Sequence, residues 1–91
     1  MTFDELNFIP HKNALEGIQA RVDFSNGYGA SVIKTPYSYG GDKGLYELAV
    51  MVKGGICYDT PITNDVEGHL TTADITRLLG EIEALPQREA A

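Results

Sequence analysis

The stretch Leu45–Asp59, LYELAVMVKGGICYD, restricts the possible folds of this chain most strongly. Side chains alternate between the two faces of a β-strand. Along residues 45–53 one face is wholly apolar or aromatic, and the other mixes apolar with charged side chains. The first face comprises Tyr46, Leu48, Val50 and Val52. A strand of this kind suits the middle of a sheet, so the pattern predicts a central strand at 45–53 and a partner strand at 56–59.

The glycine pair at 54–55 marks the turn between these strands, and the apolar pattern indicates its length. A two-residue loop would place Val52 opposite Cys57, whereas a three-residue loop at 53–55 places Val52 opposite Ile56. Opposed residues share a face of the sheet, so the three-residue loop gathers more apolar side chains on one face. We therefore expect a three-residue loop with a glycine in the left-handed conformation.

Alternating apolar residues on both sides of Ser25-Asn26-Gly27 indicate an earlier hairpin, with strands at 18–24 and 28–34. A two-residue Asn-Gly loop would place Phe24 opposite a glycine. A three-residue loop instead places Phe24 opposite Tyr28 and keeps the apolar residues of both strands in register. We expect the three-residue form, a type I turn followed by a glycine bulge.

A single amphipathic helix is predicted at 71–85. Thr71 and Asp74 have the spacing of a capping box, and Asp74 also favours the positive end of the helix dipole. An apolar stripe with helical period follows, and Pro86 ends it. The stripe comprises Ile75, Leu78, Leu79, Ile82 and Leu85. Residues 60–70, which precede the helix, have no regular period.

These elements predict an α+β fold, a four-stranded antiparallel β-meander with one C-terminal α-helix packed on one face. The strands fall at 18–24, 28–34, 45–53 and 56–59. A chain of 91 residues is expected to form one domain, 1–91. Within it, residues 18–59 form the two hairpins and 71–85 the helix. Residues 1–17 form an irregular N-terminal segment with room for a short strand at 7–9.

Charge and composition argue against several classes of protein. The net charge is −6, from 13 acidic against 7 basic residues, and the basic residues are never adjacent. Phosphate contacts require clustered Lys and Arg, so we expect no nucleic-acid partner. The single cysteine excludes an internal disulfide and fits a reducing compartment. The N-terminus does not resemble a signal peptide, and no apolar run approaches the ~20 residues of a membrane span.

Three segments together carry a resemblance to a known family. They are NGYGASV at 26–32, SYGG..GLYELAV at 38–50, and YDTPIT.DV.G.L at 58–70, followed by the amphipathic helix. This combination resembles a family of small uncharacterised acidic proteins of tailed bacteriophages and prophages. The resemblance implies a viral origin and a host-cytoplasm setting rather than a reaction. Small accessory proteins of this class commonly bind a host protein, so it also implies a non-enzymatic role in which a host protein, for example one of a defence system, is inhibited or modulated.

Motifs for chemistry are weak in this chain. The glycine-rich segment at 40–44 could cradle a phosphate, but its glycines lead into a strand rather than a helix, so a turn is the better interpretation. His11, Cys57 and His69 do not have the spacing of zinc ligands. Cys57 in a strand is more typical of a small buried hydrophobe than of a nucleophile. We expect no catalytic residue, no metal site and no cofactor.

Two groups of residues are candidates for contact with a protein partner. The first is the Tyr-Gly loop, because exposed tyrosines provide contact area at low entropic cost. The second is an acidic run that could face a basic surface. The candidate residues are Tyr37, Tyr39 and Asp42 in the loop, and Asp59, Asp65 and Glu67 in the acidic run.

Two alternatives concern assembly and ligands. The chain could instead bind or sequester a small molecule or nucleotide in a pocket between protomers near 40–44. The sheet face away from the helix has an apolar centre, predicted to consist of Ala49, Met51 and Cys57, within a polar periphery. This composition suits a homodimer interface. The N-terminal segment, with Phe3, Leu6 and Phe8, is the alternative cover for that face.

Overall fold

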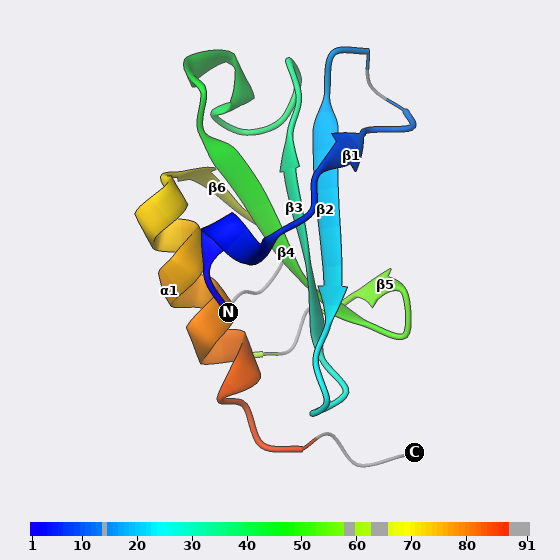
Figure 1. Cartoon of the computed structure of the whole chain (residues 1–91), viewed down its shortest axis with the longest axis vertical. Coiled ribbons are helices and arrows are strands. Elements are labelled where there is room, and N and C mark those ends of the chain that lie inside the picture. Colours follow the sequence, from blue (N-terminus) through cyan, green and yellow to red (C-terminus); the bar gives the residue numbers. More distant parts are fainter. Residues whose placement is uncertain (14, 58–59, 63–65, 88–91) are drawn as a thin grey trace.

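The computed structural model describes residues 1–13, 15–57, 60–62 and 66–87, and it has an antiparallel sheet with one helix against one face (Figure 1). The α+β class predicted from the sequence is confirmed. The strands are β1 (Ile9–Pro10), β2 (Ile18–Asp23), β3 (Gly29–Lys34), β4 (Tyr46–Val52), β5 (Gly55–Ile56) and β6 (Val66–Leu70). The helix is α1 (Thr72–Glu83), and two short 3-10 turns are η1 (Phe3–Glu5) and η2 (Gly41–Lys43).

The sheet is larger than the predicted four-stranded meander. Its order is β1-β2-β3-β4, with β5 and β6 both paired to the far edge of β4. β5 pairs with the end of β4, where Met51 faces Ile56, and β6 pairs with its start, where Tyr46 faces Leu70. β6 lies in the segment for which the sequence predicted no element. Its register shifts within the Tyr46–Leu48 pairing, and His69 has a φ of 56°, so a local irregularity hides the strand's alternation.

The register predicted for the first hairpin is confirmed. Val22 pairs with Ala30, and the N–H of Phe24 donates to the carbonyl of Tyr28 at 2.7 Å. Gly27 has a φ of 89°, the left-handed conformation that the bulge needs and that glycine adopts without steric cost.

The loop predicted for the second hairpin is wrong. Val52 pairs with Gly55 and Met51 with Ile56, so the loop has two residues, Lys53 and Gly54. Their φ values of 53° and 82° are those of a type I′ turn, whose twist matches that of the flanking strands. The strand partner β5 ends at residue 56, and residues 58–59 of the predicted strand lie outside the described residues.

The corrected loop moves Cys57 to the other face of the sheet. The N–H of Cys57 donates to the carbonyl of Val50 at 2.7 Å, and the side chain joins the buried cluster under α1. Ile56, not Cys57, therefore accompanies Met51 on the face away from the helix. Burial of a small apolar side chain beneath the helix favours this register.

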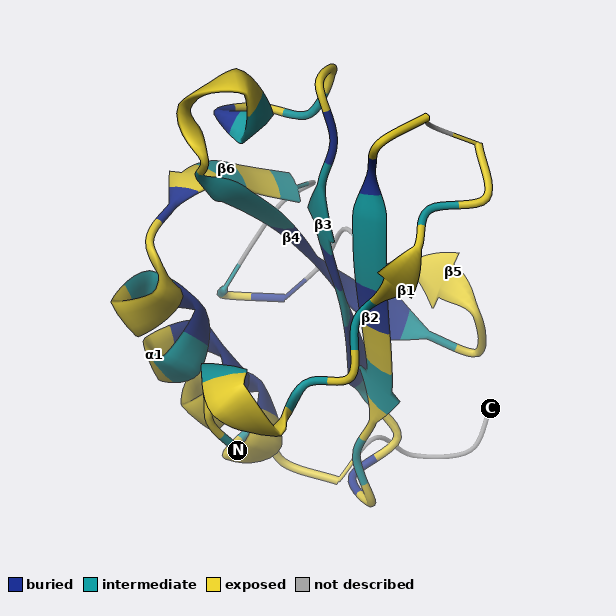
Figure 2. Cartoon of the chain, turned by 45° about the horizontal axis from the view of Figure 1, so that its top comes forward, coloured by how far each residue is buried: buried dark blue, intermediate teal, exposed yellow. Residues whose placement is uncertain are grey.

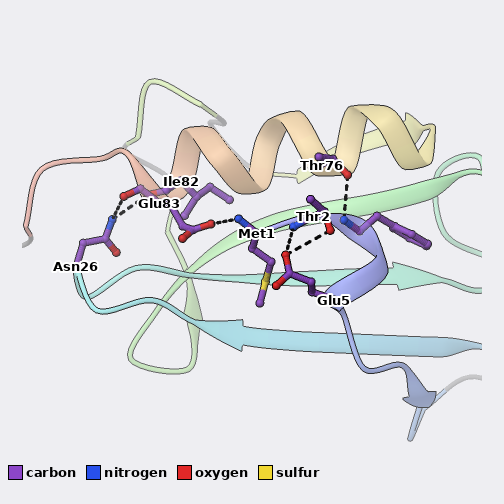
Figure 3. Close-up of polar contacts among 8 residues, drawn as sticks. Met1, Thr2, Glu5, Asn26, Thr76, Ile82 and Glu83 are labelled. Carbon is purple, nitrogen blue, oxygen red and sulfur yellow. Dashed lines mark hydrogen bonds and ion pairs between the residues drawn. The ribbon is translucent and has the colours of Figure 1, made fainter.

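Helix α1 forms where the sequence predicts it, one or two residues shorter at each end. Thr71 caps it, and the capping box with Asp74 is present. The stripe packs on the apolar face of β3 and β4, and four of its residues are buried: Ile75, Leu78, Leu79 and Ile82. At the far end, the Asn26 side chain donates to the carbonyl of Ile82 at 2.8 Å, so the turn of the first hairpin holds the end of the helix (Figure 3).

The N-terminal segment packs beside α1, on the same face of the sheet. The Phe3 N–H donates to the hydroxyl of Thr76 at 2.9 Å, and the Phe3 ring lies 5.0 Å from that of Tyr46. The α-ammonium group of Met1 pairs with Glu83 (Figure 3). The alternative in which this segment covers the opposite face is therefore wrong, because Phe3, Leu6 and Phe8 pack against the core under α1. Among the described residues, no helix lies on that second face.

Candidate functional site

The loop at 35–45 is built from its own hydrogen bonds. The Thr35 N–H donates to the Ser38 hydroxyl at 2.9 Å, and the Ser38 N–H donates back to the Thr35 hydroxyl at 2.9 Å. The Tyr37 N–H also donates to the Thr35 hydroxyl, at 3.0 Å. Gly41 lies so close that a Cβ there would overlap the carbonyl of Thr35. These contacts define one conformation for the loop backbone.

The loop is also held against the sheet through Tyr39. The Tyr39 N–H donates to Oε2 of Glu47 at 3.0 Å, and the Tyr39 carbonyl accepts from the His69 N–H at 3.0 Å. Gly68 permits this approach, because a Cβ at that position would overlap the Cβ of Tyr39. The Tyr39 backbone is thus held through both its N–H and its carbonyl. The residue itself is 63% exposed, and Tyr37 is 88% exposed.

A second loop, at 11–17, lies beside the first at the same end of the sheet (Figure 1). Strand pairing places Ile18 opposite Lys34, and a Cβ on Gly17 would lie 2.7 Å from the Thr35 methyl group. Leu15 in this loop is 87% exposed. We call the loop at 35–45, together with residues 11–13 and 15–17 of the second loop, the loop end. It is largely exposed in Figure 2, and it holds three of the five exposed large hydrophobic side chains among the described residues.

The candidate residues predicted from the sequence partly converge at this place. Tyr37, Tyr39 and Asp42 are exposed in the loop. Glu67 is exposed on β6, one residue before the glycine that contacts Tyr39. Asp59 and Asp65 lie outside the described residues. The Tyr-Gly loop and Glu67, which the sequence presented as separate candidates, are therefore neighbours.

Leu15 was missed from the sequence. It lies in HKNALEG, a segment without period, and a single leucine in a loop carries no pattern. The available signal was its isolation. Before Gly17, no apolar residue stands three or four positions from Leu15, so Leu15 has no partner for a helical apolar stripe.

The loop at 35–45 does not offer a phosphate cradle. Such a site needs unengaged backbone N–H groups. Here five N–H groups donate to carbonyls within the loop, and they belong to Ser38, Gly41, Lys43, Gly44 and Leu45. The structure therefore agrees with the turn interpretation of this segment.

The three residues considered for zinc lie in different places. His11 is in the loop that follows β1, Cys57 is buried under α1, and His69 is on β6. Among the residues that the structure describes, no three His, Cys, Asp or Glu side chains are grouped closely enough to hold a metal ion.

The face away from the helix differs from the predicted dimer surface. Cys57 is not part of it, as the corrected hairpin shows. Ala49 and Met51 do lie there, but they are only 7% and 8% exposed, so the apolar centre is recessed rather than flat.

Comparisons with known proteins add no identification. No protein-family model, curated protein or solved structure matches the chain. Within the described ranges, every helix is too short or too polar to cross a membrane.

Proposed function

We propose that this chain is a non-enzymatic phage accessory protein that binds a host protein through its loop end and inhibits or modulates it. The resemblance of residues 26–32, 38–50 and 58–70 to small phage and prophage proteins supports the viral origin and, with it, a setting in the host cytoplasm. A protein of a host defence system is one partner of this kind.

The grouping of Leu15, Tyr37 and Tyr39 is the observation that carries this proposal. Tyr37 and Tyr39 are exposed on backbone that hydrogen bonds hold in place, and Leu15 is exposed in the loop beside them at the same end of the sheet. Binding residues are frequently found on loops positioned by a rigid scaffold. Tyrosine in particular provides a large contact area while losing little conformational entropy, and it is enriched at protein interfaces.

Charge supports a basic partner. The net charge of −6 accelerates encounter with a positively charged surface. Asp42 is exposed in the loop end and Glu67 is exposed on β6 beside it, so both add negative charge to this part of the surface. A nucleotide at 40–44 is the weaker alternative, because the N–H groups of Gly41, Lys43 and Gly44, which would contact its phosphates, already donate to carbonyls of the loop.

A pull-down from a host lysate tests the proposal. Three baits are compared: the wild type, the double variant Tyr37→Ala/Tyr39→Ala, and Ile56→Ala. Ile56 is also an exposed apolar residue, but it lies in β5, so its truncation is a matched control. We expect one stoichiometric host protein to be retained by the wild type and by Ile56→Ala, and lost with the double variant.

The opposite results are also informative. Equal recovery with all three baits would place binding elsewhere on the chain. Failure of the wild type to retain any host protein at stoichiometric level would overturn the proposed function.

A further inference from the structure

The face of the sheet that α1 leaves uncovered is hollowed at its centre. Ser31 on β3 lies opposite Ala49 on β4, so two small side chains meet there. Larger apolar side chains surround them, namely Ile33, Ile56 and Val66. Because the small residues do not fill the space between the larger ones, a pocket of about 260 Å³ opens on this face.

The shape of this pocket favours a ligand that protrudes into it over a flat partner. Ala49 and Met51 form its apolar floor, yet both are almost completely shielded from solvent. A second sheet packed across the face would touch the rim and leave the floor out of contact. The volume is just below the roughly 300–1,000 Å³ of pockets for drug-sized ligands, so the matching ligand is a smaller molecule.

Polar groups at the rim determine the chemistry of that ligand. Gln19 and Glu47 lie on either side of Ile33 in one row across β2, β3 and β4. The Gln19 amide donates to the Ser31 hydroxyl at 3.2 Å, which leaves the Gln19 carbonyl oxygen as an acceptor. The Glu47 carboxylate accepts from Tyr39 through one oxygen and has further lone pairs.

Among the described residues that line the pocket, Glu47 carries the single formal charge when histidine is counted as neutral. The His11 Nδ1 accepts from the Asn13 N–H at 3.1 Å, so the neutral ring carries its proton on Nε2. A cation is therefore favoured at the Glu47 side, and the net charge of −6 favours its approach.

We propose that this pocket binds a small primary amine with an apolar body. The body fills the hollow over Ala49 and Met51, and the ammonium group pairs with Glu47. This site lies on the sheet face and adjoins the loop end, because His11 lines it and Glu47 accepts from the Tyr39 N–H. Binding of the amine does not depend on the proposed host-protein partner.

An NMR titration of the ¹⁵N-labelled chain with three probes of the same size tests the proposal. The probes are 2-phenylethylamine, neutral 2-phenylethanol and anionic phenylacetate. We expect amide shifts confined to the neighbourhood of Ser31, Glu47, Ala49 and Met51, with affinity falling from the amine to the alcohol to the acid. Binding of the acid as tightly as the amine, or shifts spread over other surfaces, would overturn it.

Two variants and one control separate the contribution of the Glu47 charge to binding from the contribution of the pocket's volume. Glu47→Gln should weaken the amine by roughly two- to fivefold, the range of a partly exposed ion pair, and leave the alcohol unchanged. Glu67→Gln removes the same charge from β6 outside the pocket and should change neither. Ala49→Leu should fill the hollow and abolish binding of both probes.

The titration of the wild type with the three probes tests the proposal even if Ala49→Leu does not fold. Light scattering of the free chain provides the last check. A mass of twice 9.9 kDa that Glu47→Gln or Ala49→Leu converts to the monomer would show that a second copy occupies this face, and would overturn the proposal.

Discussion

The carbonyl of Tyr39 accepts a hydrogen bond from the His69 N–H at 3.0 Å, which joins the tyrosine loop to the strand before the helix. The two residues are far apart in sequence, and neither segment has a regular period. Their contact explains why Tyr37 and Tyr39 can remain exposed on an ordered backbone. The hydrogen bond also depends on Gly68, which leaves the space that the Tyr39 Cβ occupies.

Gly68→Ala should displace the loop. Its new Cβ would overlap the Cβ of Tyr39, and overpacking of this kind costs about 1–3 kcal/mol. Urea unfolding should therefore show lower stability, and amide shifts should change at 35–45. Gly80→Ala is the matched control, because its Cβ meets nothing within 4 Å and the helix should gain about 0.5–1 kcal/mol. If Gly68→Ala left both the stability and the amide shifts unchanged, the packing of the loop at 35–45 against β6 would be contradicted.

Asn26→Ala should destabilise the chain by about 1–3 kcal/mol, because it leaves buried polar groups without partners. The Asn26 amide nitrogen donates to Ile82 at 2.8 Å and to Leu85 at 3.1 Å. The measurement is the midpoint of urea unfolding. The control is Asn13→Ala, at an exposed position in the loop that follows β1. Equal midpoints for the two variants would mean that the turn does not hold the helix.

Lys53→Asn should stabilise the second hairpin by about 0.5–1 kcal/mol. Lys53 has a φ of 53°, a conformation that asparagine adopts more readily than lysine, and Asn-Gly is a favoured type I′ pair. Thermal unfolding measures the gain. Lys43→Asn, in η2, makes the same chemical change without a positive φ and should give none. If Lys53→Asn lost stability, the result would favour the three-residue loop at 53–55 that the sequence predicted.

Leu78→Ala and Val50→Ala should each destabilise by roughly 2–4 kcal/mol, because both remove core contacts and leave a cavity. The two side chains lie in one buried cluster, on the helix and on β4. Calorimetric melting of the variants checks the expectation. Melting temperatures close to that of the wild type would refute the packing of α1 on this face.

Asp74 should contribute to stability through its ionised form. The Thr71 backbone N–H, followed by the Thr71 hydroxyl, lowers the pKa of Asp74 from its usual value of 3.8. A lowered folded-state pKa gives stability that is fully present above the unfolded value and is lost as pH falls through the folded value. The stability difference between wild type and Asp74→Asn should therefore shrink below about pH 4. Asp4→Asn serves as control, and a pH-independent difference would exclude this linkage.

The first hairpin and the helix could be predicted because local rules agreed there. Around Phe24 and Tyr28, the alternation of both strands and the position of Gly27 all favour the same register. At the second turn, both predicted registers placed Gly55 in the loop. The twist of the type I′ turn instead placed Lys53 in the left-handed region, and no apolar pattern signals that choice.

The candidate site depends on contacts that no local pattern encodes. Tyr37 and Tyr39 were identified by residue type alone, and their exposure follows from how Thr35 and Gly68 hold the loop. Leu15 becomes a neighbour of the loop only through the pairing of β2 with β3. Ala49 was assigned to the correct face, but whether that face is flat or hollow depends on the shape of the whole sheet.

The bond from Asn26 to the end of the helix also bears on the order of folding. The two partners are 56 residues apart, so the last carbonyls of α1 receive this donor only after more than half of the chain has closed into a loop. Loop closure of this length costs entropy before any contact repays it. An isolated peptide of residues 71–87 would thus fray at its C-terminal end, and formation of the helix end and docking of the first hairpin become one kinetic event.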